Sequence, residues 1–195
     1  ADPLLPFIPV ILVTAKAATS DVIAGLEAGG DEYLTKPVNH GALVARVKSM
    51  LRIKELHDTV VEQSAQLRHQ LKAATKIQSL FWPQVPKQES SCSIWAVSVP
   101  AAYVGGDLYD IIPLPDGSYL CYVADVAGKG VPAALIMAAL STKFRTVAHL
   151  HQDLNELLQN VNSTMHDLLF EEGFFDTVIL SRYWPATGRL QFIRA

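Results

Sequence analysis

The chain has 195 residues, half of them apolar, which is enough for one or two domains with a hydrophobic core. Its formal net charge is −3 and its lysines and arginines are scattered, so no nucleic-acid partner is expected. The two cysteines lie far apart in the sequence, which indicates a reducing cytoplasm. The sequence has neither a signal-peptide pattern nor an apolar run of roughly 20 residues, so no membrane contact is expected.

The first 52 residues alternate short apolar runs with helical patterns. Glycines and prolines separate these segments, and Thr19 or Ser20 is expected to cap the first helix. The expected order is a buried parallel strand over residues 8–14, a helix over 21–28, a short strand that residues 31–34 lead into and that ends at 35–37, and a helix over 40–51. This order of elements predicts an α/β fold.

Two motifs in this segment carry a family resemblance. They are Ile-Pro-Val-Ile-Leu-Val-Thr-Ala at residues 8–15 and Ala-Gly-Gly-Asp-Glu-Tyr-Leu-Thr-Lys-Pro at residues 28–37. Together they resemble the C-terminal half of a response-regulator receiver domain, a flavodoxin-like fold. The resemblance implies that Thr14 and Lys36 contact a phosphoryl group on an aspartate and that Tyr33 changes rotamer with Thr14. It also implies a cis bond between Lys36 and Pro37.

The resemblance covers only half of a receiver. The family's phosphoacceptor aspartate, its acidic metal pair and its first three strands would lie before Ala1. About 50 residues of a half-receiver cannot bury a full core alone, so we expect the chain to be a piece of a longer protein. A sensor histidine kinase would be the partner of the complete receiver.

An alternative concerns residues 29–33, Gly-Gly-Asp-Glu-Tyr, which resemble the Gly-Gly-Asp-Glu-Phe signature of diguanylate cyclases. That signature belongs on a hairpin inside a larger domain. Here Leu-Thr-Lys-Pro follows at once, and the surrounding sequence is that of a receiver, so the receiver interpretation is preferred.

Residues 53–86 form the expected linker, and the sequence from Arg52 to Leu80 contains neither glycine nor proline. Apolar residues and glutamines recur there at spacings of four and three, which is typical of a coiled-coil seam. The seam positions are Leu56, Val60, Gln63, Leu67, Gln70, Ala74, Ile77 and Phe81. We expect one helix that continues from the last receiver helix and forms a parallel homodimer. The alternative is a single amphipathic helix that packs on its own domain.

The stretch 104–140 carries the candidate chemistry. Residues 119–124 are apolar and β-prone, which predicts a buried strand with Asp125 at its end. Asp107 follows a glycine pair, and Leu-Pro-Asp-Gly at 114–117 predicts a hairpin that brings Asp107 beside Asp125. Two carboxylates at strand ends suit Mg²⁺ or Mn²⁺, although aspartates and glycines at such places commonly serve only as turn residues.

A second resemblance rests on the order of these features: a glycine pair, Asp107, a hairpin, Asp125, then two more glycines before an apolar helix. With this order, residues 74–195 resemble the metal-dependent protein phosphatases, which have the protein phosphatase 2C-like or PPM fold. Within these enzymes, the resemblance is to the SpoIIE-like bacterial branch. The resemblance implies a β-sandwich flanked by helices that removes phosphate from phosphoserine or phosphothreonine. It also implies two Mn²⁺ or Mg²⁺ ions, with Asp125 bridging them and the Val126 carbonyl as a further ligand. Asp107 would be a ligand or would orient metal-bound water.

That chemistry requires no nucleophilic side chain, because paired ions lower the pKa of a bridging water that attacks phosphorus directly. Cys92 and Cys121 are therefore interpreted as ordinary apolar residues. Asp110 is interpreted as either a residue of the ligand shell or a turn residue. Lys129 is interpreted as a solvated turn lysine, with contact to substrate phosphate as the alternative. Asp176 is assigned no metal role.

The remaining segments complete the expected phosphatase part. They are a first strand over residues 93–100, helices over 133–147 and 153–169, and strands over 174–183 and 190–193 joined by a hairpin at 185–188. Ile-Gln-Ser-Leu-Phe-Trp-Pro at residues 77–83 resembles the segment ahead of SpoIIE-like domains. That family continues past the position of Ala195 with Gly-His and later two acidic ligands, so we expect the chain as given to lack part of the site.

The sequence predicts three parts. They are the C-terminal half of a receiver over residues 1–52, a helical coiled-coil linker over 53–86 and the N-terminal part of an α+β phosphatase domain over 87–195. We expect a cytoplasmic response regulator whose phosphatase acts on an anti-sigma-factor antagonist and so controls transcription. The main alternative is a catalytically inactive, phosphatase-like scaffold that binds a signalling partner as a receiver-controlled dimer. A DNA-binding regulator is disfavoured, because the sequence after the linker has neither a basic face nor a helix-turn-helix pattern.

Overall fold

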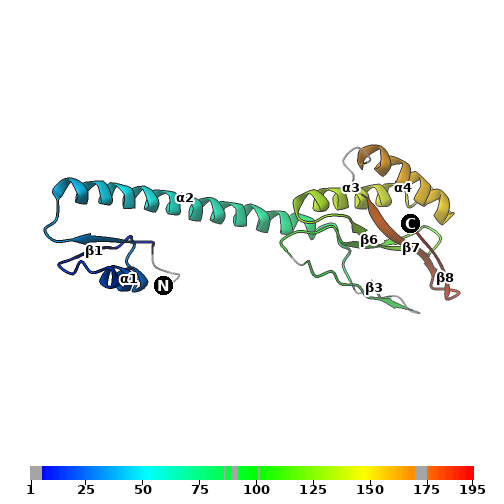
Figure 1. Ribbon diagram of the computed structural model, residues 1–195. Coiled ribbons are helices and arrows are strands. Elements are labelled where there is room, and N and C mark those ends of the chain that lie inside the picture. The colour runs from blue at the N-terminus through cyan, green and yellow to red at the C-terminus, as the bar shows by residue number, and fades with distance from the viewer. Residues whose placement is uncertain (1–5, 86, 89–91, 101, 170–174) are drawn as a thin grey trace. The chain divides into compact units, whose positions relative to one another are not determined.

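The computed structural model describes residues 6–85, 87–88, 92–100, 102–169 and 175–195 (Figure 1). The chain separates into two compact units, Ala1–Arg68 and His69–Ala195. The boundary between the units falls inside α2 (His40–Gln78), a helix of 39 residues. In the described part of the chain, no helix combines the length and the apolar character needed to cross a membrane.

The first unit pairs two short parallel strands, β1 (Ile11–Thr14) and β2 (Glu32–Thr35), with α1 (Thr19–Glu27) between them. The side chain of Leu12 lies against the turn after α1. A Cβ on Gly30 would come within 2.7 Å of the Leu12 side chain, so a larger residue here would have to displace that side chain. The predicted order of strand, helix, strand and helix is confirmed.

Residues 29–33 do not form a hairpin. Gly29 adopts a φ of +104° at the end of α1, and the chain then enters β2 at Glu32. The carboxylate of Asp31 accepts a hydrogen bond from the Val10 N–H at 2.8 Å, which fixes the turn to the preceding strand segment. The cyclase-like motif therefore lies in a helix-to-strand connection, as the receiver interpretation requires.

The predicted cap of α1 is wrong. Ala18 occupies the N-cap position, and no side chain makes a capping hydrogen bond there. Thr19 and Ser20 lie inside the first turn instead, because the helix begins before the residues expected to cap it.

Helix α2 begins after Asn39, whose side-chain oxygen accepts a hydrogen bond from the Ala42 N–H at 3.0 Å. Within the first unit, Lys54 of this helix donates to the Phe7 carbonyl at 3.2 Å, and the Phe7 ring contacts the His57 ring. As expected, the helix continues without a break from the receiver part into the linker. Four apolar seam positions are more than half exposed: Leu56, Val60, Leu67 and Ile77.

The second unit is built on one antiparallel sheet in the order β5-β6-β7-β8. Its strands are β5 (Leu108–Pro113), β6 (Tyr119–Val126), β7 (Asp176–Trp184) and β8 (Arg189–Arg194). Gly117, with a φ of +79°, lies in the turn between β5 and β6, and Gly188, with a φ of +67°, lies in the turn between β7 and β8. Both hairpins were predicted from these turn residues and are confirmed.

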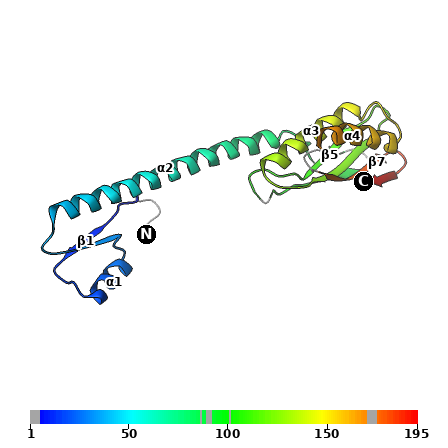
Figure 2. The ribbon, with the colours of Figure 1, turned by 45° about the horizontal axis from the view of Figure 1, so that its top comes forward.

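Helices α3 (Val131–Val147) and α4 (Leu154–Leu169) cover one face of this sheet (Figures 1 and 2). Because side chains alternate along a strand, Tyr122 and Ala124 of β6 point to these helices, whereas Val123 and Asp125 point to the opposite face. The Tyr122 ring stacks on Phe144 of α3 with 4.3 Å between the ring centroids. The buried apolar residues form one core between sheet and helices, so Asp125 lies on the other side of the sheet from this core.

The predicted strand over residues 93–100 is mostly wrong. Only β4 (Ser93–Ile94) forms, paired with β3 (Lys87–Gln88), and residues 95–100 join no ladder. A strand needs a neighbour for its backbone hydrogen bonds, and the described residues provide none for this segment. The described strands form one four-stranded sheet and two separate pairs, so the β-sandwich of the phosphatase fold stays a prediction.

A buried arginine links the β5–β6 hairpin to β7 by hydrogen bonds. Arg182 donates to the Asp116 carboxylate at 2.8 Å, to the Ser118 hydroxyl at 2.9 Å and to the Gln152 carbonyl at 2.9 Å. Ser118 donates in turn to Asp116 at 2.6 Å. These hydrogen bonds, led by the one from Ser118, lower the pKa of Asp116 to about 2. The hairpin is therefore held at its tip as well as along its strands.

Candidate functional site

Asp107 and Asp125 face each other at one end of β5 and β6. The register pairs Leu108 with Ala124, and its continuation by one residue sets Asp107 opposite Asp125. The pKa of Asp107 is raised, first by the loss of surrounding water and then by the charge of the neighbouring Asp125. Two carboxylates this close repel each other when both are ionised, and a cation bound between them would remove that repulsion. The structure thus brings together the two aspartates that the sequence predicts as ligands.

The Val126 carbonyl lies beside the glycine that precedes Asp107. A Cβ on Gly106 would come within 2.6 Å of the Val126 oxygen and 3.3 Å of the Ala133 Cβ, so no larger residue fits. Ala127, which follows β6, donates its N–H to the carbonyl of Phe175, just before β7, at 2.8 Å. Because the C=O and N–H of one trans peptide point in opposite directions, the Val126 carbonyl points to the β5 side. The third predicted ligand therefore lies at the same end of the hairpin as the aspartate pair.

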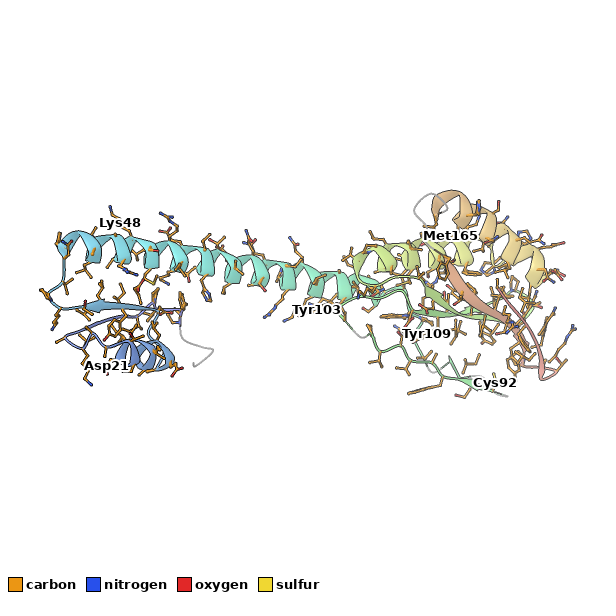
Figure 3. All side chains as sticks on the ribbon, viewed as in Figure 1. Asp21, Lys48, Cys92, Tyr103, Tyr109 and Met165 are labelled. Atoms are coloured by element: carbon orange, nitrogen blue, oxygen red, sulfur yellow. The ribbon has the colours of Figure 1, made fainter. Side chains whose placement is uncertain are left out.

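A cavity of about 470 Å³ opens next to both carboxylates. Its walls are the ends of β5 and β6 and the segment 96–99, which lies over the open face of the sheet. Tyr109, labelled in Figure 3, donates its hydroxyl hydrogen to the Ala96 carbonyl at 3.4 Å and joins this segment to β5. The aspartate pair is thus reachable by a small ligand from this side.

In the described part of the chain, no three His, Cys, Asp or Glu side chains gather as a metal site would require. Asp176 lies opposite Val126 in the β6–β7 register, and burial raises its pKa, but it joins no such group. Cys92 and Cys121 are free, and burial raises the pKa of Cys121 to about 11, which keeps that thiol protonated. The candidate site is therefore the aspartate pair with the Val126 carbonyl.

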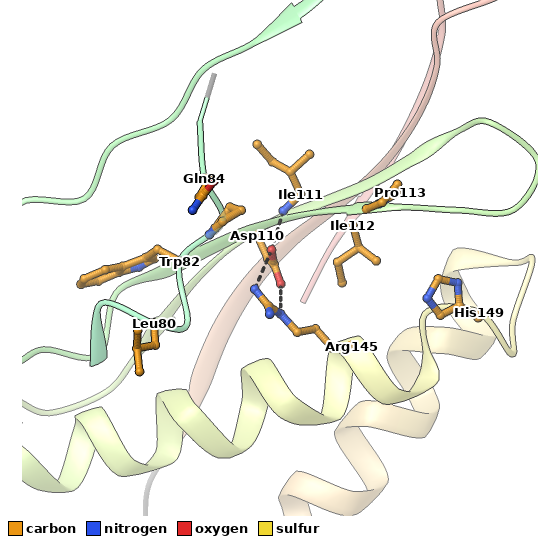
Figure 4. Close-up of a pocket in the computed structure, with 10 residues that line it drawn as sticks. Leu80, Trp82, Gln84, Asp110, Ile111, Ile112, Pro113, Arg145 and His149 are labelled. Atoms are coloured by element: carbon orange, nitrogen blue, oxygen red, sulfur yellow. Dashed lines mark hydrogen bonds and ion pairs between the residues drawn. The ribbon is translucent and has the colours of Figure 1, made fainter. Parts of the chain in front are cut away.

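Asp110 is neither a residue of the ligand shell nor a turn residue. It lies in β5 on the core side, and its carboxylate accepts hydrogen bonds from Arg145 Nε at 2.6 Å and Nη2 at 3.2 Å (Figure 4). Arg145 also donates to the Phe81 carbonyl at 2.9 Å. The pair joins β5, α3 and the turn after α2, beside a cavity of about 490 Å³. Its role in the structure is to hold these three elements together.

Gln78, in the last turn of α2, was not among the residues predicted from the sequence. Its side chain is only 5% exposed. Gln78 Nε2 donates to the Gly105 carbonyl at 2.6 Å, and Oε1 accepts a hydrogen bond from the Gly105 N–H at 3.3 Å. One turn earlier, the Thr75 hydroxyl donates to the Tyr103 carbonyl at 2.5 Å (Tyr103 is labelled in Figure 3). The signal in the sequence was a polar residue on the apolar face formed by positions 74, 77 and 81.

The predicted receiver residues gather at the carboxyl ends of β1 and β2. The backbone N–H of Lys36 donates to the Thr14 carbonyl at 2.8 Å, so these two residues are neighbours. The Tyr33 hydroxyl donates to the carbonyl of Lys16, and the Lys16 N–H donates to the Thr14 hydroxyl oxygen at 3.2 Å. The bond between Lys36 and Pro37 is cis, as expected. The roles of these residues in sensing a phosphoryl group stay predictions.

Comparison with known proteins matches this chain both to phosphatases and to response regulators. The family model of stage II sporulation protein E (SpoIIE) matches residues 115–195. Phosphoserine phosphatase RsbU of Bacillus subtilis is 27% identical over 128 residues, which are 65% of this chain and 37% of that protein. Response regulator PleD of Caulobacter vibrioides is 42% identical over 64 residues, 33% of this chain and 14% of that protein.

Among solved structures, the RsbU and RsbW domains of Rv1364c from Mycobacterium tuberculosis match with a TM-score of 0.43 and 26% identity. That match covers 51% of this chain and 28% of the other. The chain spans less than two fifths of the length of each of these three proteins. The response-regulator similarity concerns the N-terminal region.

Proposed function

We propose that this chain, which joins a response-regulator segment to a segment similar to SpoIIE and RsbU, is a signal-controlled protein phosphatase acting on phosphoserine or phosphothreonine. The observation that carries this proposal is that Asp107 and Asp125 lie opposite each other at the open end of the β5–β6 hairpin, close enough for the charge of Asp125 to raise the pKa of Asp107. The similarity to a protein named as a phosphoserine phosphatase supplies the reaction class.

The residues at this end of the hairpin fit a divalent cation. Carboxylate and carbonyl oxygens are the ligands that Mg²⁺ and Mn²⁺ prefer. Asp125, Asp107 and the Val126 carbonyl would provide oxygens to such ions. When bound, the ions would polarise the phosphoryl group and lower the pKa of a coordinated water. Two carboxylates do not complete a two-ion site, so we propose that further acidic ligands come from outside the described residues.

The protein's own residues provide position and access. The hairpin register holds the two aspartates opposite each other, and the close contact of Gly106 with Val126 sets the Val126 carbonyl beside them. The adjoining cavity admits a phosphoryl group to the same face. The site is therefore arranged on paired strands rather than on free loops, which favours precise positioning of ligands.

We propose an anti-sigma-factor antagonist as the substrate class, so that the protein controls transcription without contacting DNA. A sensor histidine kinase would act on the complete receiver, and Thr14, Tyr33 and Lys36 would respond at the ends of β1 and β2. The cytoplasm, where these partners work, is the proposed location.

We propose a homodimer through α2. The apolar seam positions Leu56, Val60 and Leu67 are exposed on this helix, and a parallel partner helix would cover them. Gln63 and Gln70 would fall in the same seam, where polar residues favour one register at some loss of stability. The receiver would then act on the phosphatase by changing the packing of these helices.

The competing proposal is a metal-free scaffold that holds a signalling partner. It draws support from the same site, where the described residues bring only two carboxylates together. The two proposals differ in turnover, because a scaffold releases no phosphate whatever metal is added.

Phosphate release from a phosphoserine protein, with Mn²⁺ titrated in, separates the two proposals. We expect the natural full-length protein to show Mn²⁺-dependent turnover and the Asp125→Asn variant to lose at least about a hundredfold of it. Asp153→Asn is the matched control, because Asp153 caps α4 away from the site and asparagine also caps well. A folded protein that releases no phosphate from several substrates would favour the scaffold.

A further inference from the structure

The last turn of α2 is bonded to the loop that leads into Asp107. Thr75 contacts the Tyr103 carbonyl, and Gln78 contacts both backbone polar groups of Gly105. Tyr103 and Gly105 precede Asp107 by four and two residues. The helix that enters the second unit therefore touches the connection to one of the two carboxylates, although it touches neither carboxylate itself.

The donor and acceptor of the Gln78 side-chain amide complement the backbone carbonyl and N–H of Gly105. A backbone N–H can only donate and a carbonyl can only accept, so Oε1 must face the N–H and Nε2 the carbonyl. Glutamate would keep the acceptor and lose the donor, and methionine would keep the length and lose both. Because Gln78 is almost fully buried, losing either bond leaves a polar group without a partner.

The loop is fixed on its other side as well. Gly106 packs against the Val126 oxygen and the Ala133 side chain so closely that a Cβ does not fit. The segment of Gly105 and Gly106 is thus held between α2 and the end of β6. A displacement of the last turn of α2 would move this segment, and with it the spacing of Asp107 from Asp125 and Val126.

We infer that Gln78 is a positioning residue, which couples the end of α2 to the aspartate pair through the backbone of Gly105. This inference rests on the proposed phosphatase function and adds the residue through which the helix acts. We expect substitution of Gln78 to change the metal affinity and kcat. The KM for the phosphoprotein should change little, because Gln78 contacts no part of the cavity beside the aspartate pair.

The test compares Gln78→Met, Gln78→Glu and Gln66→Met in the natural full-length protein. Gln66 lies exposed on the same helix, outside the seam, so its variant controls for the change of residue type. For Gln78→Met we expect kcat to fall about tenfold and the Mn²⁺ concentration at half-saturation to rise several-fold. Gln66→Met should match the unmodified protein in both.

Amide hydrogen exchange at Gly105 gives a readout independent of turnover. We expect Gly105 to exchange about tenfold faster in Gln78→Met and to keep most of its protection in Gln78→Glu, which retains the acceptor. If Gln78→Met does not fold, Thr75→Val removes the other bond to the loop, and it should change kcat and Mn²⁺ half-saturation in the same direction by a smaller factor.

The possible failures are distinguishable. Absence of Mn²⁺-dependent turnover in the unmodified protein would overturn the proposed function. Turnover in the unmodified protein, together with Gln78→Met behaving as Gln66→Met in kcat, Mn²⁺ half-saturation and Gly105 exchange, would overturn this inference alone.

Discussion

The two units differ in how far they bury their side chains. No described residue before Gln78 is buried, and α1 has apolar side chains that remain about half exposed, such as Ile23 and Leu26. In the second unit, α3 alone buries seven residues, and the core continues through β5, β6, β7 and α4. The second unit therefore holds its shape by burial, whereas the first depends more on backbone pairing and a few polar contacts.

A catalytic pair needs ligands that are held in fixed positions, because misplaced ligands lose activity. The buried hairpin meets that need, and the predictions below test how far the contrast extends.

The largest effect on stability is expected from a substitution in the core of the second unit. Phe144 is fully buried against Tyr122, so Phe144→Ala should lower the free energy of unfolding by roughly 3–5 kcal/mol. Phe7→Ala in the first unit, where the ring is partly exposed, should cost about 1 kcal/mol.

Denaturant unfolding followed by tryptophan fluorescence measures the first of these effects, because all three tryptophans lie in the second unit. Circular dichroism follows both units and measures the second. Equal losses from the two variants would contradict the contrast between the units.

A smaller effect on stability is expected to differ between alanine substitutions at two neighbouring glycines. An alanine Cβ at position 106 would clash with the Val126 oxygen, whereas one at Gly105 meets nothing within 4 Å. We expect Gly106→Ala to lower the free energy of unfolding by about 1–3 kcal/mol and to raise the Mn²⁺ requirement for turnover. Gly105→Ala should be close to neutral in both. Thermal melts and metal titrations measure the pair, and similar results for the two variants would argue that the loop is not held against β6.

The smallest effect concerns pH. The pKa of Asp116 is lowered to about 2 by its bonds to Ser118 and Arg182, so the stabilisation from this carboxylate is present above pH 4. It is lost as pH falls from about 4 toward 2. The unmodified protein should therefore lose more stability over this range than Asp116→Asn, as measured by thermal melts. Parallel stability curves would show that the carboxylate does not stabilise the hairpin.

The sequence predicts those features of the fold that depend on local patterns. The β5–β6 hairpin follows from its turn residues, and the two-residue period of the strands then places Asp107 opposite Asp125. The continuous helix α2 follows from a long stretch without glycine or proline. The residues that carry the candidate site were therefore identifiable before the structure.

Features that depend on distant contacts could not be predicted in this way. Asp110 is buried because Arg145, 35 residues later on α3, packs against it. Gln78 has a role only because the loop at Gly105 returns to α2 after 27 residues. Residues 95–100 have a strand-like pattern, yet pattern alone does not supply the neighbour that a strand needs.

The most direct test of the central claim is the anomalous scattering of Mn²⁺ in crystals of the natural full-length protein. The account predicts a peak at the end of the β5–β6 hairpin, about 2 Å from a carboxylate oxygen of Asp125 and close to Asp107 and the Val126 carbonyl. It also predicts that the peak disappears in Asp125→Asn and remains in Asp153→Asn. Manganese bound elsewhere, with the aspartate pair free of metal at saturating Mn²⁺, would contradict the assignment.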